Sequence, residues 1–226
     1  METRLIFRCG KYKRKEHRSM AKVKFGLKNI HLFKLTETES EGVVSMSYGD
    51  AVAFPGAVSL SLSKETSDTS PFYADDGVYF MPAVNPTGYS GTLEMALLST
   101  NVRTAFMNYI KDAADTVVEL GSAATVYFGL TCDFTTDTGL IKKVFYKCSF
   151  GAPDVTGNTT EDTTTPGTVS IPITILPTSK QFTYTDSANV EHTTSVISSY
   201  ADENSDATVY ASWHTTPHLP DFEGES

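Results

Sequence analysis

Apolar and polar residues alternate along several segments of the chain, with the period of two that is typical of β-strands with one face in solvent. In segment 58–63, Val58, Leu60 and Leu62 alternate with serines. The other alternating segments are 92–97, 126–134, 144–150, 169–175 and 209–213. This pattern predicts a fold built mainly from amphipathic strands that turn their apolar faces toward a core.

Two of these segments flank a short turn, Asp137-Thr138-Gly139. Since alternation resumes after the turn, segments 126–134 and 144–150 are predicted to pair as a β-hairpin. With the turn centred near Thr138, Cys132 is expected to face about Val144.

One segment has the spacing of an amphipathic helix, from Thr100 to Ala114, with Ser99 or Thr100 as its N-cap. Apolar residues recur on one face of it, at 102, 105, 106, 109, 110 and 113. The predicted fold class is therefore mainly β: an antiparallel β-sandwich or barrel with one flanking α-helix and long loops or arms.

Polar segments at 36–42, 63–70 and 154–168 are predicted to be loops. The chain is divided into a basic leader (1–19), a β-domain (20–213) and a flexible acidic C-terminal tail (214–226). The leader is expected to be disordered or to lie upstream of the true translation start, and Met20 is the favoured start.

The net charge of −9 is unevenly distributed. The leader holds seven Lys and Arg against two Glu, so the rest of the chain carries a net −14. An acidic body argues against a nucleic-acid reader; Lys13, Arg14 and Lys15 either bind nucleic acid or form a solvated tail, and we favour the tail. The three cysteines are scattered, which argues against a disulfide framework. The sequence has no apolar run of about 18 residues, so we predict no membrane-spanning segment.

The chain has five histidines, and four of them lie outside the leader and are candidate metal ligands. His214 and His218 are four residues apart, but Pro217 between them breaks the helix that would align their side chains. His192 lies in a polar stretch and His31 in a predicted N-terminal strand. We interpret all four as structural or incidental.

The remaining candidates for chemistry are equally weak. Cys132 and Cys148 belong to apolar alternations, so they are predicted to be small core residues rather than nucleophiles. Asp75 and Asp76 precede a glycine but lack the spacing of a calcium loop, and the Asn158-Thr159-Thr160 glycosylation pattern carries no weight without a secretory signal. We predict that the chain is not an enzyme and has no catalytic, cofactor-binding or metal-binding residue.

Several phrases, in the same order along the chain, resemble the major tail proteins (tail tube proteins) of siphophages that infect Gram-positive bacteria. The resemblance covers about residues 20–200, and the basic leader departs from it. The phrases are AKVKFGLKNIH at 21–31, AFPGAVSLSL at 53–62, FYADD at 72–76 and YSGTLE at 89–94.

The resemblance implies a virion protein of the phage tail, made in the host bacterial cytoplasm. Its fold would be two packed antiparallel sheets with a helix at the side. Subunits would form a ring, typically a hexamer, and stacked rings would form a hollow tube whose inner wall is a barrel shared by all subunits. The implied partners are the chain itself, a tape measure protein in the lumen, and tail terminator and baseplate or distal tail proteins; DNA would pass through during ejection without specific binding.

These expectations agree with the residues in physical terms. Strands such as 58–63 and 168–175 can turn Ser and Thr toward a water-filled lumen. Joining open sheet edges in a ring pairs backbone groups that would otherwise favour aggregation. Pro172 and Pro177 predict that their strand lies at an edge. Acidic loops at 36–50 and 63–77 are expected to contact the next ring, so that deleting 37–41 or 64–70 would spare folding but abolish tubes. Loop 154–167 is expected to face outward.

A rival interpretation is a β-sandwich binding module that decorates a virion or binds host-surface carbohydrate. Such a module would display an exposed aromatic cluster. The alternating pattern places most Tyr and Phe residues in a core instead.

Overall fold

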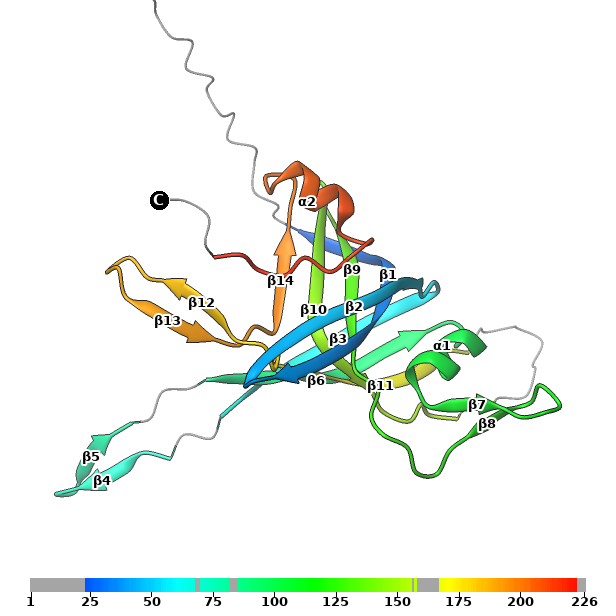
Figure 1. Ribbon diagram of the computed structural model, residues 1–226, viewed down its shortest axis with the longest axis horizontal. Coiled ribbons are helices and arrows are strands. Elements are labelled where there is room, and N and C mark those ends of the chain that lie inside the picture. The colour runs from blue at the N-terminus through cyan, green and yellow to red at the C-terminus, as the bar shows by residue number, and fades with distance from the viewer. Residues whose placement is uncertain (1–22, 68–69, 82–84, 156, 158–166, 223–226) are drawn as a thin grey trace, which may run out of the picture.

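The computed structural model describes residues 23–67, 70–81, 85–155, 157 and 167–222, and these residues form a mainly antiparallel β structure (Figure 1). The leader 1–19 and the Asn158 pattern lie outside the described residues, as does most of loop 154–167. The strands are β1 (Lys24–Ser40), β2 (Val43–Ala53), β3 (Ala57–Thr66), β4 (Phe72–Ala74), β5 (Gly77–Phe80), β6 (Pro86–Met95), β7 (Tyr109–Lys111), β8 (Val117–Glu119), β9 (Phe128–Thr136), β10 (Leu140–Phe150), β11 (Val169–Leu176), β12 (Phe182–Thr185), β13 (Glu191–Thr194) and β14 (Ser198–Ala201). The helices are α1 (Thr100–Phe106) and α2 (Ala207–Ser212).

One large sheet organises the chain. Its strand order is β2-β1-β9-β10-β11-β6-β3, and β14 pairs with β10 as the eighth strand. The two end strands, β2 and β3, follow each other in sequence and are joined by residues 54–56 alone, so the sheet curls upon itself without closing into a barrel. The prediction of a mainly β, antiparallel fold is confirmed.

The concave side of the sheet holds the main hydrophobic core. The alternating segments supply it as predicted, with Leu93 and Met95 from β6 and Ile171, Ile173 and Ile175 from β11 all buried. Burial of each such side chain contributes roughly 1.5–3 kcal/mol to the free energy of folding. Helix α1 completes this core with Val102 and Phe106.

The predicted hairpin is present as β9 and β10. Its turn is closed by the Thr136 amide, which donates to the Gly139 carbonyl at 2.8 Å. Cys132 lies opposite Lys143, one position from the expected Val144.

The first predicted helix is shorter than expected. Ser99 is its N-cap, as predicted, because its hydroxyl accepts from the Val102 amide. The helix ends at Phe106 rather than Ala114, since Asn108 takes a positive φ of 58° and leaves the helical path. Asp112 then accepts the amides of Ala114 and Thr116 in a tight turn, so the second half of the predicted helix forms the β7–β8 hairpin instead.

The predicted strand at 209–213 is wrong, because this segment lies in helix α2 and its C-cap. Asp206 caps the helix by accepting the amides of Thr208 and Val209. Val209 and Trp213 are four residues apart, so they share a helical face, and both pack in a second core on the convex side of the sheet.

Residues 214–222, which were predicted to be part of a flexible tail, contact the rest of the fold. Residues 213–222, which we call the C-terminal strap, cross the convex side of the sheet and cover the second core of Val144, Tyr146 and Ala201. The Tyr146 hydroxyl donates to the His218 carbonyl at 2.9 Å, and Phe222 reaches the rings of Phe182 and Tyr184. The β-domain thus extends at least to Phe222.

The strand that contains Pro172 lies inside the sheet, between β10 and β6, so the edge prediction is wrong. The proline is tolerated because β10 ends at Phe150, just before the position where an amide at 172 would need a partner. The Pro172 carbonyl accepts from Gly151, the first residue after that end. Pro177 follows β11.

Two predicted acidic loops are largely strands. Residues 36–50 lie in the β1–β2 hairpin, whose turn is Glu41-Gly42 with both residues at positive φ. Residues 63–66 continue β3. Deletion of 37–41 would remove Glu37, whose carboxylate accepts from Lys147 at 2.6 Å, and deletion of 64–70 would remove the end of the β3–β6 ladder. Each deletion would remove paired backbone, so we expect each to lower the stability of the subunit as well.

Candidate assembly surfaces and the histidine cluster

A continuous polar surface covers the outer side of β3, β6 and β11. Directly opposed residues share a face of a sheet, and the register sets Ser59 opposite Glu94 and Ser61 opposite Thr92 on it. Leu60, Leu93 and their neighbours point the other way, into the core. We call this surface the hydroxyl face; its residues are Ser59, Ser61, Ser63, Glu65, Ser90, Thr92, Glu94, Ser170, Pro172 and Thr174.

The charges of the hydroxyl face are two carboxylates. Each is held by a hydroxyl of the adjacent strand: Ser59 donates to Glu94 at 3.0 Å, and Ser90 donates to Glu65. The next strand brings Lys147 to the margin of the face, where Glu37 neutralises it. The two carboxylates make the surface polar and acidic, and Lys147 at its margin is in an ion pair.

The large sheet has two free edges. Strand β2 has 11 residues and is paired only with β1 in the described structure, and β3 has 10 residues and is paired there only with β6. Each edge exposes unpaired amides and carbonyls that can pair with another strand. No Pro is present in either strand, so every residue along these edges keeps its backbone amide as a donor.

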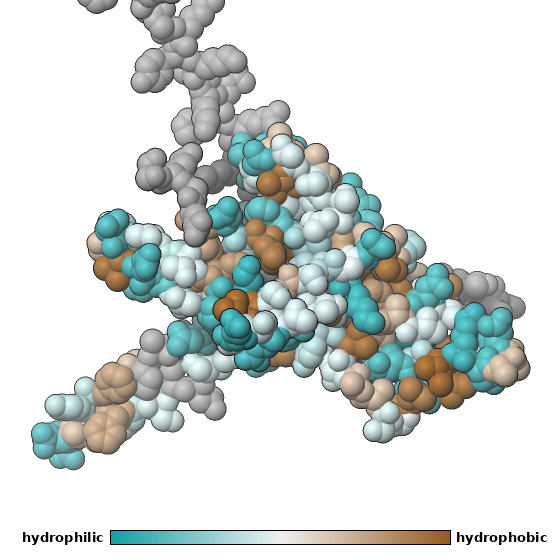
Figure 2. Space-filling model, in the orientation of Figure 1, coloured by the Kyte–Doolittle hydropathy of each residue, from teal (hydrophilic) through white to brown (hydrophobic). Residues whose placement is uncertain are grey.

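A small hairpin lies beyond the end of the β3–β6 ladder (Figure 1). It consists of β4 and β5, and we call residues 70–81 the arm hairpin. Phe72, Tyr73, Tyr79 and Phe80 are each more than 60% exposed. These four side chains are exceptions to the prediction that most Tyr and Phe residues belong to a core. Figure 2 shows apolar residues, in light brown, at the surface of the arm.

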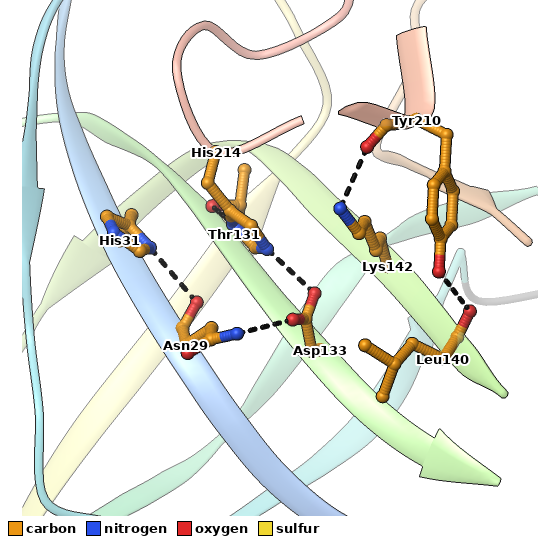
Figure 3. Close-up of polar contacts among 8 residues, drawn as sticks. All are labelled: Asn29, His31, Thr131, Asp133, Leu140, Lys142, Tyr210 and His214. Atoms are coloured by element: carbon orange, nitrogen blue, oxygen red, sulfur yellow. Dashed lines mark hydrogen bonds and ion pairs between the residues drawn. The ribbon is translucent and has the colours of Figure 1, made fainter. Parts of the chain in front are cut away.

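Side chains from three elements meet under the C-terminal strap in a histidine cluster (Figure 3). Asp133 of β9 is almost fully buried and accepts from His214 Nε2 and from Asn29 Nδ2, both at 2.7 Å. His214 Nδ1 lies 2.9 Å from the hydroxyl of Thr131. His31 stacks on His214 with ring centroids 4.9 Å apart.

The backbone of β1 is shaped to supply this cluster. A register shift between Lys28 and His31 forms a bulge, and Asn29 within it has a φ of 53°. His31 Nδ1 donates to the Asn29 carbonyl at 3.1 Å. The bulge thus aims the Asn29 amide at Asp133.

A Thr–His–Asp set resembles the arrangement that activates a hydroxyl nucleophile. Here Thr131 is fully buried and Asp133 is 1% exposed, so a substrate has no route to the hydroxyl. Burial alone would raise the Asp133 pKa, but the hydrogen bonds from His214 and Asn29 outweigh it and hold the pKa below its usual range. We interpret the cluster as the fastening of the C-terminal strap to the sheet.

The other candidates remain apart from one another. His192 pairs with Asp186 in the β12–β13 turn at 2.8 Å, while His218 contributes its backbone carbonyl to Tyr146. Asp75 and Asp76 form the turn of the arm hairpin, both at positive φ. Within the described part of the chain, no three His, Cys, Asp or Glu side chains come close enough to hold a metal ion.

The prediction that Cys132 and Cys148 are core residues is confirmed. Cys132 and Cys148 are buried free thiols in the main core. Burial raises the pKa of the Cys132 thiol to about 12 and that of Cys148 well above its ordinary value, so neither is a thiolate at neutral pH.

Sequence reasoning missed the partner of His214 and the exposure of the aromatic residues on the arm. Asp133 and His214 are 81 residues apart, and no local pattern links them. The aromatic cluster of the arm had a local signal, since segment 70–81 holds four aromatic residues beside a turn.

No helix among the described residues has the length and apolar character needed to cross a bilayer. Comparison of the chain with protein-family models and with curated proteins finds no match.

Proposed function

We propose that this chain is a structural subunit that assembles with copies of itself into rings, and that stacked rings form the hollow tail tube of a phage virion. The observation that carries the proposal is the pair of free edges, β2 and β3, at the two ends of one curled sheet. An edge of about ten residues is long enough to nucleate pairing with another strand, and such edges are otherwise blunted or covered. Pairing β2 of one copy with β3 of the next satisfies both edges and repeats around a ring.

The hydroxyl face supports a position in the lumen. In a closed ring of sheets, one face turns toward the channel, and a channel that carries DNA benefits from weak attraction for phosphate. Ser and Thr keep such a wall hydrated, and Glu65 and Glu94 add negative charge. A tape measure protein would occupy the same lumen before ejection, and tail terminator and baseplate or distal tail proteins would close the ends of the tube.

The resemblance of residues 21–31 and 53–62 to siphophage tail tube proteins supports this proposal independently of the sheet edges. The first phrase falls largely in β1, which is the neighbour of the edge strand β2, and the second spans the junction between the two edge strands, β2 and β3. Both phrases therefore lie in or beside the strands that we propose to pair between copies.

Proline substitution at two successive positions of β2 tests ring formation with an internal control. Successive residues of a strand point their amides to opposite sides, so of Ser45→Pro and Met46→Pro one removes a bond to β1 and the other removes an amide from the free edge. We expect one variant to lose stability and the other to keep its melting temperature but fail to form rings in negative-stain micrographs. Normal rings from the variant that stays folded would refute edge pairing.

A second candidate function is favoured by the arm hairpin. Exposed Phe72, Tyr73, Tyr79 and Phe80 are the kind of cluster on which a carbohydrate-binding module stacks sugars. Binding of the purified chain to a host cell-wall polysaccharide, lost on substitution of Tyr79 and Phe80 while rings still form, would support this alternative.

A further inference from the structure

The arm hairpin has an apolar surface that its own chain leaves open. Tyr79 is 75% exposed, Tyr73 64% and Val78 53%, and Phe72 lies opposite Phe80 in the register. A two-stranded hairpin alone in water is marginal, and it gains stability from packing on a further strand or helix. The arm therefore needs a surface to cover it.

A second open apolar surface lies on the β7–β8 hairpin. Ile110 sits opposite Val118, and these residues are 50% and 40% exposed. Their neighbour Tyr109 turns to the opposite side and is buried, where the Arg103 guanidinium lies over its ring. The outward face of this hairpin is thus aliphatic.

A hollow of about 280 Å³ lies beside this hairpin, between the end of α1 and the start of the segment after β10. Met107, Tyr109 and Leu120 line it together with Phe150 and Pro153. Leu120 is 40% exposed, so the aliphatic face continues into the rim of the hollow.

The two surfaces lie at opposite ends of β6 and cannot meet within one chain. The arm precedes Pro86, and α1 with the β7–β8 hairpin follows Met95. Ten residues of strand span about 33 Å. Figures 1 and 2 show the arm and the β7–β8 hairpin at the two ends of the long axis of the molecule.

We propose that the arm hairpin of one copy docks on the outward face of the β7–β8 hairpin of a second copy. This inference rests on the proposed function, which supplies the second copy at high local concentration, and it specifies the contact between successive rings. The contact is head-to-tail, so every copy offers one arm and one receiving face, and repetition gives an open stack.

The arm surface contributes apolar area to such a contact. Aromatic side chains bury about 150–250 Å² each when fully covered, and the four on the arm are 61–75% exposed. Successive residues of a strand face opposite sides, so this area is divided between the two faces of the hairpin, with roughly 200–325 Å² on each. With several copies in a ring, these contacts act together.

Two paired variants test the contact. Tyr79→Thr with Phe80→Thr removes two of the four aromatic side chains of the arm, one from each face, and Ile110→Thr with Val118→Thr removes the aliphatic receiving face. All four changes keep residues that favour strands. Tyr200→Thr, at an equally exposed tyrosine of β14, is the matched control.

We expect each double variant to form rings but to need a protein concentration at least about 30-fold higher for stacking, the effect of losing one dominant contact residue. An equimolar mixture of the two variants should give pairs of rings and no longer stacks, because the intact arm of one fits the intact face of the other. The Tyr200→Thr control should stack as the wild type does.

Normal stacking by either double variant would overturn the docking, as would equal loss of stacking in the control. Paired rings of the Ile110→Thr, Val118→Thr variant alone would replace it with an arm-to-arm contact. If the wild type forms neither rings nor stacks, the proposed function itself fails; wild-type tubes with unaffected variants refute the docking alone.

Discussion

Replacement of Trp213 by Ala is predicted to destabilise the whole subunit, because the C-terminal strap covers the second hydrophobic core. Trp213 is 2% exposed and packs with Val144, Tyr146 and Ala201. Truncation of a buried aromatic residue to Ala costs about 3–5 kcal/mol. For a chain of this length each kcal/mol lowers the melting temperature by about 2–4 °C, so a fall of roughly 10 °C is expected.

Trp213→Phe separates packing from hydrogen bonding at the same position. The indole Nε1 of Trp213 is buried without an acceptor in the described structure, and an unsatisfied buried donor costs about 1–3 kcal/mol. Phe keeps most of the ring and omits this donor, so the loss of stability should be less than half that of Trp213→Ala.

Thermal unfolding followed by circular dichroism measures both variants, with Tyr200→Ala, at an exposed residue of β14, as the control that should change little. Trp213 is the one tryptophan of the chain, so wild-type fluorescence reports the strap directly and should show the blue-shifted emission of a buried indole. A packed strap would be refuted if Trp213→Ala melted within roughly 2 °C of the wild type and the wild-type tryptophan showed the emission of a solvent-exposed indole.

Three further predictions concern acid stability, thiol protection and the lumen. The Asp133 pKa is lower in the folded chain than in the unfolded chain, so ionised Asp133 stabilises the fold above the unfolded pKa of about 3.9, and this stabilisation is lost as pH falls through the folded pKa. Asp133→Asn should therefore melt at a lower temperature than the wild type at neutral pH, and the difference in melting temperature should narrow in acid. A difference that does not change with pH would contradict the role of this charge. Cys132 and Cys148 should resist a thiol reagent until the chain unfolds, and rapid labelling of either in the native protein, read by mass spectrometry, would contradict their burial. Assembled tubes of Ser61→Lys with Thr92→Lys, which are opposed on the hydroxyl face, should retain duplex DNA in a low-salt gel shift that wild-type tubes do not. Equal retention by the two kinds of tube would show that DNA does not reach this face, which contradicts a position in the lumen.

The strands of the large sheet were predictable because their burial repeats every two residues. The residues of β11 alternate between the core and the outer face in the structure as they do in the sequence, and local alternation needs no knowledge of the partner strand. The position of β11 within the sheet was not predictable from its prolines. Pro172 is accommodated by the length of β10, which is a property of another segment.

The two errors in helical segments have a common physical cause. Segment 107–114 continues an apolar spacing, but Asn108 and Asp112 favour turn conformations through their own side chains. At 209–213 too few residues were available to distinguish a period of two from helical spacing, and the Asp206 cap decides for the helix. In both places, local conformational preferences of polar residues outweighed the hydrophobic pattern: turn formation at 108–112 and helix capping at Asp206.

The candidate surfaces were predictable only in part. Alternating serines at 59, 61 and 63 predicted a polar face, but its extension over β6 and β11 depends on register. The attachment of the strap through His214 and Asp133 depends on a tertiary contact. Neither feature leaves a signal within one segment.

The most direct test of self-assembly is electron microscopy of the purified chain over a concentration series, with the mass of each species measured in parallel by light scattering. We predict closed rings of identical subunits at low concentration and hollow tubes of stacked rings at higher concentration. A single species with the mass of one chain at every concentration would contradict the account.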